Sequence, residues 1–121
     1  MGWKNRPETL AKSAEKAAET VTRGAIVHLW RQVVRRSPVD TGRFRANWQF
    51  NEGSPIGTQL EVNTAPSPPN VVGNPLGKTY YLTNNVPYAG RLDQGSSQQA
   101  PMGVTALSIL ETEAWIAEKL K

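Results

Sequence analysis

The sequence predicts an α+β fold in a single domain, and three observations lead to this expectation. An apolar periodicity of three and four residues runs through the first third of the chain, short strand-like segments follow it, and a second helical periodicity closes it. The 121 residues suit one domain, 1–121, with one modest core. We expect a long basic helix within residues 1–36, a small antiparallel β-sheet within 43–85 and a C-terminal helix over 103–120.

The first helix is expected from Pro7 to Arg36. Proline suits the first turn of a helix, and Pro38 disfavours helical conformation in the residue before it. The apolar stripe consists of Leu10, Ala14, Ala17, Val21, Ala25, Leu29 and Val33, broadened by Ala18, Ile26, Trp30 and Val34. A helix of this length measures about 44 Å, whereas a compact domain of this size is about 30–35 Å across. We therefore expect the helix to overhang its own domain, and Gly24 to mark either a bend or a close helix contact.

Three segments have the sequence of β-strands. Residues 43–51, RFRANWQFN, alternate in polarity and predict a half-buried strand, either directly or after a short helical turn from Thr41. Residues 58–64 alternate likewise, and the EGSPIG segment between the two predicts a hairpin connection. Residues 79–85, TYYLTNN, predict a third strand.

Between the last two strands lies a long proline-rich segment, residues 65–78. Four prolines and two glycines among its fourteen residues predict an irregular loop. Loops of this length in so small a domain are usually either functional or disordered. Residues 86–103 are also rich in turn formers, with one helical turn expected at 88–92.

The C-terminal helix is expected to bury Val104, Leu107, Leu110, Ala114 and Leu120, with Ile109 and Ile116 beside them. The carboxylates of this segment, Glu111, Glu113 and Glu118, are expected on its solvent-exposed face.

The net charge of +4 is unevenly distributed along the chain. Residues 1–45 carry ten Lys or Arg against four Asp or Glu, which gives +6, and residues 46–121 carry four against six, which gives −2. Such a chain either binds nucleic acid or packs head-to-tail with copies of itself. Five arginines form the concentrated basic region: Arg31, Arg35, Arg36, Arg43 and Arg45. Protein contact, DNA phosphate contact and plain solvation are the three interpretations of this cluster, and no known nucleic-acid-binding motif accompanies it.

Residue types that support catalysis or metal binding are scarce. The chain has no cysteine and a single histidine, His28, so we expect no metal site. The glycines of VVGNPLGK lack the spacing of a phosphate-binding loop, and no serine lies in a nucleophile elbow. No apolar run approaches the ~20 residues of a membrane-spanning helix. We expect neither an enzyme nor a cofactor nor a membrane partner.

Four segments together resemble a known family. They are the long N-terminal helix, SPVDTGRFRANW, VPYAGRLDQGSSQQAP and the C-terminal helix. In this order they are similar to the neck or tail-completion proteins of long-tailed phages, relatives of the lambda minor tail protein Z. The matching residues are Pro38, Asp40, Thr41, Gly42, Phe44, Tyr88, Ala89, Leu92, Asp93, Gly95 and Pro101. Asp93 stands where glutamate is more usual in the family, and the family pattern does not include the 65–78 loop.

The resemblance implies a structural protein of the virion, assembled in the cytoplasm of a bacterial host. Such proteins form rings, typically hexameric, that join the tail tube to the DNA-filled head, so the expected partners are copies of the chain, neighbouring neck and tail-tube proteins, and genome DNA through non-specific contact. Asp40 and Thr41 would cap and orient the turn, and Tyr88 with the segment Arg91–Gly95 would lie near a subunit contact or the lumen. A tail terminator ring, a head-side stopper ring and a small DNA-binding protein are the alternatives.

Within that interpretation, the loop is expected to contact an adjoining ring. Its prolines limit the conformational entropy lost on docking. The residues expected to dock are Pro66, Pro68, Pro69, Val71, Val72, Pro75 and Leu76.

Overall fold

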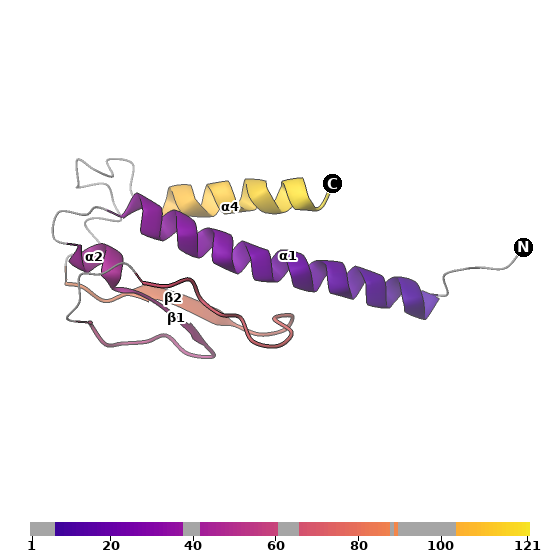
Figure 1. Cartoon of the computed structure of the whole chain (residues 1–121), viewed down its shortest axis with the longest axis horizontal. Helices are drawn as coiled ribbons and strands as arrows, with labels where there is room; N and C mark the ends of the chain where they lie inside the picture. Colours follow the sequence, from indigo (N-terminus) through magenta and orange to yellow (C-terminus); the bar gives the residue numbers. More distant parts are fainter. Residues whose placement is uncertain (1–6, 38–41, 61–65, 88, 90–103) are drawn as a thin grey trace, which may run out of the picture.

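The computed structural model describes residues 7–37, 42–60, 66–87, 89 and 104–121. Its elements in chain order are α1 (Pro7–Arg36), α2 (Arg43–Ala46), β1 (Trp48–Glu52), β2 (Tyr80–Asn84) and α4 (Thr105–Lys119). Helix α1 lies between α4 on one side and the two-stranded sheet on the other (Figure 1). This arrangement confirms the predicted α+β fold, with a long first helix, a small antiparallel sheet and a closing helix.

Helix α1 extends well beyond the elements that pack on it (Figure 1). Every residue from Leu10 to Ala18 is exposed, whereas Trp30 and Val33 near the other end are 6% and 1% exposed. The predicted overhang is therefore confirmed, and the apolar stripe read from the sequence is buried only in its second half.

The core lies where the second half of α1, the sheet and the beginning of α4 meet. Its buried members are Val33, Phe44, Trp48, Val86 and Val104, and the partly buried Leu29, Val34, Leu82 and Ala89 pack around them. Fully burying one such side chain stabilises the fold by about 1.5–3 kcal/mol. The core thus draws on both ends of the sequence and holds the end of α1 against the sheet.

Strand β1 begins later than the alternation predicts. Residues Arg43–Ala46 form the short helix α2, and only Trp48–Glu52 are extended. Helical geometry brings Phe44 and Trp48, four residues apart, together edge to face at 5.6 Å. Of the two alternatives expected for residues 43–51, the structure has the second, a short helical turn followed by a strand.

The two strands pair antiparallel, with Trp48 opposite Asn84 and Phe50 opposite Leu82. Phe50 also stacks on Tyr80 at 5.4 Å between ring centroids. The third predicted strand is therefore confirmed as β2.

The predicted hairpin between 43–51 and 58–64 is not formed. The backbone of β1 pairs with β2 instead, and residues 57–60 have no regular structure, while 61–64 lie outside the described residues. The sheet therefore has two strands in the described part of the chain.

Side-chain amides hold the 56–60 segment over one face of the sheet. The amide nitrogen of Asn47 donates to the carbonyl of Leu60 at 3.0 Å, and its oxygen accepts from the Leu60 N–H at 2.6 Å. Gln49, two residues along and thus on the same face, donates to the carbonyl of Thr58 at 2.6 Å. Asn85 donates to the same carbonyl at 3.0 Å. The polar residues of the alternation therefore bind another segment of the chain instead of facing solvent.

The inward face of α4 agrees with the prediction at Val104 but differs from it further along the helix. Val104, Ser108 and Thr112, at intervals of four, are 0%, 0% and 6% exposed. By contrast Leu110 and Leu120, which were expected in the core, are 60% and 65% exposed. The hydrophobic pattern alone therefore predicted burial wrongly for Leu110 and Leu120.

The close approach of α1 and α4 explains this orientation. A Cβ built on Gly24 would lie 2.5 Å from Cη2 of Trp115, so the two helices meet at a point where only glycine fits. Small residues suit such a contact, and the hydroxyl of Ser108 satisfies its hydrogen-bonding need within α4, at the carbonyl of Val104. Gly24 thus marks a close helix contact, which was one of its two interpretations.

Candidate functional site

The end of α1 and the segment after it form a polar junction. The hydroxyl of Ser37 donates to the carbonyl of Val33 at 2.6 Å and accepts from Nε1 of Trp48 at 2.7 Å. Ser37 is 3% exposed, so both bonds are shielded from water. The serine that ends the long helix therefore also fixes the first residue of the sheet.

The motif after α1 is described from Gly42 onward. Gly42 has φ of 74°, a left-handed conformation that favours glycine. It precedes α2, which places Phe44 in the core at 3% exposure. Two of the residues that carry the family resemblance therefore shape this junction.

Arg45 closes the C-terminal end of α1. Its guanidinium donates to the carbonyls of Arg35 and Ser37 at 3.3 and 3.2 Å. Cations are favourable there because the last carbonyls of a helix carry a partial negative charge. Arg45, which was a candidate for DNA or protein contact, is therefore engaged inside its own chain.

A carboxylate of α4 engages two further arginines of the cluster. Glu111 forms an ion pair with Arg36, and its other oxygen lies 4.0 Å from Arg35. The side chain of Arg36 is 26% exposed and that of Glu111 is 40% exposed, so Glu111 does not lie on a free solvent face as expected. The charge complementarity predicted between subunits thus operates, in part, within one chain.

Two arginines of α1 keep outward-facing charge. The side chain of Arg35 is 73% exposed despite its contact with Glu111, and Arg31 is exposed without an ion pair among the described residues. Of the four arginines of the expected cluster whose side chains the structure describes, Arg31 and Arg35 therefore form a small basic surface near the end of α1.

His28 lies in the α1–α4 contact. Its Nδ1 is 2.8 Å from the hydroxyl of Thr112, and its ring stacks on Trp115 at 5.4 Å between centroids. Burial lowers the pKa of His28 below its ordinary value of 6.5, and the neighbouring charges of Arg31 and Arg35 lower it further. The neutral imidazole is the form that this contact favours.

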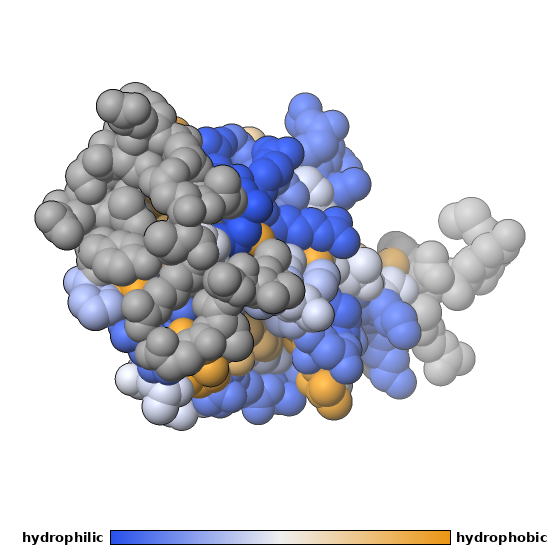
Figure 2. Space-filling view, turned by 60° about the vertical axis from the view of Figure 1, so that its left-hand side comes forward, coloured by the Kyte–Doolittle hydropathy of each residue, from blue (hydrophilic) through white to orange (hydrophobic). Residues whose placement is uncertain are grey.

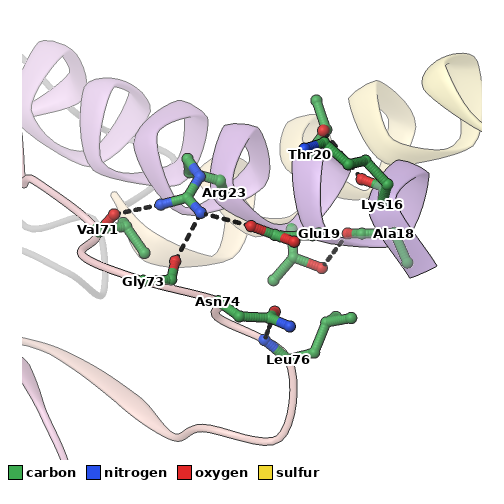
Figure 3. A network of polar contacts seen from close by, with 10 residues as sticks. Lys16, Ala18, Glu19, Thr20, Arg23, Val71, Gly73, Asn74 and Leu76 are labelled. Carbon is green, nitrogen blue, oxygen red and sulfur yellow. Dashed lines mark hydrogen bonds and ion pairs between the residues drawn. The ribbon is translucent and has the colours of Figure 1, made fainter. Parts of the chain in front are cut away.

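Arg23 is a key residue that sequence reasoning missed (Figure 3). Its guanidinium donates to the carbonyls of Val71 and Gly73, the latter at 2.6 Å, and pairs with Glu19 at 3.0 Å. One side chain of α1 therefore holds two points of the proline-rich loop. The available signal was the Glu19–Arg23 spacing of four, which is typical of a helical ion pair.

Two of the loop residues that were expected to dock elsewhere are buried in their own chain. Val71 is 7% exposed and Pro75 is buried, so neither offers surface to a partner. Val72, which lies between Val71 and Gly73 in the sequence, is 72% exposed. Of the other residues expected to dock, Pro68 is exposed and three are half-buried: Pro66, Pro69 and Leu76.

Several predicted positions lie outside the described residues. They are Pro38, Asp40, Thr41, Tyr88, Arg91, Asp93, Gly95 and Pro101. The side chain of Arg43 also lies outside them, and so does most of the helical turn expected at 88–92.

Two further features of the described residues concern metal-binding clusters and membrane-spanning helices. No cluster of three or more His, Cys, Asp or Glu side chains able to hold a metal ion occurs among the described residues. Within the same residues, no helix combines the length and apolar character that crossing a membrane requires. Figure 2 shows separate hydrophobic patches between hydrophilic side chains on the face that it presents.

Comparison with known proteins gives no relative. No family model, no curated protein and no solved structure matches the chain.

Proposed function

We propose that this chain is a structural subunit of the neck of a long-tailed phage. In this proposal it is a tail-completion protein that forms a ring, a hexamer by family resemblance, and joins the tail tube to the DNA-filled head. The support from the sequence is the ordered set of motifs on both sides of the sheet. The support from the structure is the long helix α1, whose residues Leu10 to Ala18 are exposed and offer a surface to a neighbouring subunit.

The observation that carries the proposal is the uncovered stretch of α1 near its N-terminal end. Nine successive residues, Leu10 to Ala18, are exposed, and Leu10 is 49% exposed. A helix in water without tertiary packing is marginal at this length, because most helical stability in proteins comes from burial of an apolar face. A neighbouring subunit that covers this stretch supplies that burial.

The arrangement of the arginines favours a structural role over free DNA binding. Arg36 is paired with Glu111 and Arg45 binds the carbonyls of Arg35 and Ser37, so both side chains are engaged inside the chain. A DNA-binding protein needs such charges free for phosphates, and its affinity falls steeply with salt. We therefore keep DNA contact as a secondary property of the assembled ring, at Arg31 and Arg35.

The proline-rich loop remains our proposed contact with an adjoining ring, narrowed to its exposed tip. Arg23 fixes the residues on both sides of Val72, which lowers the entropy cost of docking this side chain. Substitution of Val72 by Asp should leave the ring intact and reduce head–tail attachment. Normal infectivity of Val72→Asp phage would contradict this part of the proposal.

The experiment that tests the proposal is electron microscopy of lysates from a phage lacking this protein. DNA-filled heads beside separate tails are expected, and joined particles should return when the wild-type gene is supplied. Tails of irregular length would point to the terminator ring, and emptied heads to the stopper ring. Normal joined particles without the protein would refute a role in the neck.

A further inference from the structure

Helix α4 carries its large aliphatic side chains on the side away from α1. Three of the six exposed large hydrophobic residues in the described part of the chain lie on this helix: Ile109, Leu110 and Leu120, at 45%, 60% and 65% exposure. Exposed alanines, Ala106 and Ala117, fall on the same side by helical geometry. One carboxylate, Glu113, also lies there. Helix α4 thus contacts α1 through Thr112 and the ring of Trp115 and presents a largely apolar face to solvent.

The uncovered stretch of α1 offers a second apolar surface of a different kind. Leu10, Ala17 and Gly24 are seven residues apart and lie on one face of the helix. Gly24 faces α4, so this face points in the direction of α4 but continues past its end (Figure 1). Apart from Leu10, its exposed apolar residues are alanines, including Ala14.

The contact inside the chain shows how surfaces of these two kinds fit together. At Gly24 the smallest residue type on α1 receives the ring of Trp115, the largest on α4, at a separation that leaves no room for a methyl group. At this point one large side chain of α4 packs on a position of α1 that has no side chain. The outward face of α4 needs a partner surface of the same small kind, and the uncovered stretch of α1 is one.

We propose that residues 10–18 of α1 in one copy pack on the outward face of α4 in a second copy, against Ile109, Leu110 and Leu120. This inference rests on the proposed ring and names its subunit contact. A chain cannot make the contact with itself. Ala14 lies about 21 Å along the helix axis from His28, and His28 contacts α4 at Thr112 on its inner side.

The geometry of such a contact suits a ring. Its two surfaces differ, so each copy uses one surface toward each neighbour, and repetition closes a ring or extends a filament. Two helices in contact over about three turns bury less than the ~1,200 Å² of a stable pairwise interface. A single contact is therefore weak, and we expect free subunits to be monomeric in dilute solution and to associate when many contacts close together.

Site-specific disulfide cross-linking of the full chain tests the inference, because the natural sequence has no cysteine. Ala14→Cys and Leu110→Cys are placed in separate chains, both at exposed positions. We expect a cross-linked dimer when the two variants are mixed at high concentration under oxidising conditions, and at least tenfold less from either alone. Lys12→Cys is the matched control, because Lys12 is also exposed but points to the opposite side of α1.

Three results would overturn the inference. They are absence of the mixed cross-link, an equal yield with Lys12→Cys, and a dominant cross-link of Ala14→Cys with itself, which would indicate pairing of two α1 helices. Electron microscopy of the deletion phage separates this outcome from failure of the proposed function. Separate heads and tails without the cross-link leave the neck role standing and remove only this contact, whereas the cross-link with normal joined particles keeps the contact and removes the neck role.

Discussion

Substitution of Gly24 by alanine tests the α1–α4 contact. Whether it raises or lowers the free energy of unfolding depends on one neighbouring side chain, Trp115. In an exposed helix interior, glycine to alanine stabilises by about 1 kcal/mol, because alanine has the higher helix propensity. Here the new methyl group would lie 2.5 Å from Cη2 and 3.3 Å from Cζ2 of Trp115. The indole is a rigid ring that also stacks on His28, so it cannot yield without losing that contact.

Overpacking of this kind costs about 1–3 kcal/mol. With a clash of about 2 kcal/mol against a propensity gain of about 1 kcal/mol, Gly24→Ala should lower the free energy of unfolding by about 1 kcal/mol. This corresponds to a fall in Tm of about 4 °C for a domain of this size. In a Trp115→Ala background the obstacle is absent, and the same substitution should stabilise by about 1 kcal/mol.

Urea unfolding followed by far-ultraviolet circular dichroism gives the four free energies of this double-mutant cycle, with an expected coupling of about 2 kcal/mol. Equal effects of Gly24→Ala in both backgrounds would show that the two helices do not approach as closely as described. The reasoning would also fail if the substitution stabilised the wild-type chain.

Three further substitutions probe the junction, the loop and the histidine. Ser37→Ala should cost about 1–3 kcal/mol, since it leaves the buried Nε1–H of Trp48 without its acceptor. Urea unfolding checks this, and in a Trp48→Phe background the cost should fall by more than half. Arg23→Met should raise the rate of proteolysis within residues 66–78 at least tenfold, because it removes the hydrogen bonds to the loop carbonyls. Arg23→Lys should give a rate between those of wild type and Arg23→Met, because a lysine binds one carbonyl less firmly than a guanidinium binds two. An unchanged cleavage rate would show that Arg23 does not hold the loop. Because the folded state lowers the pKa of His28, the unfolded chain binds the proton more tightly, so the free energy of unfolding should fall as the pH falls below 6.5. Replacement by Gln should remove that slope, and a slope equal to wild type would show that another group causes it.

Local signals in the sequence determined the elements of this protein. Pro7 and Pro38 bracket a helix because of their backbone constraints, and the structure has that helix at Pro7–Arg36. The comparison of helix length with domain size also predicted the overhang. These inferences depend on geometry within one segment, which does not require knowledge of its neighbours.

Tertiary contacts decided which face of each helix is buried and which segments pack together. The amphipathic pattern of α4 indicated that Leu110 is buried, but the side that carries Ser108 and Trp115 faces inward, with Trp115 against Gly24 of α1. The alternation after α1 suited a strand, yet packing of Phe44 on Trp48 favours a turn of helix there. An amphipathic pattern shows that a face is buried against something without identifying the partner.

For the candidate site, too, some features follow from the sequence and others only from the tertiary structure. The sequence by itself determined that the chain concentrates positive charge near the end of the first helix and has no cysteine and a single histidine. Only the tertiary structure decided that Arg36 and Arg45 are engaged within the chain, and that Arg23 holds the proline-rich loop from a position 50 residues away from Gly73. Charge is a property of composition, whereas the partner of a charge is set by which segments the folded chain brings within hydrogen-bonding distance.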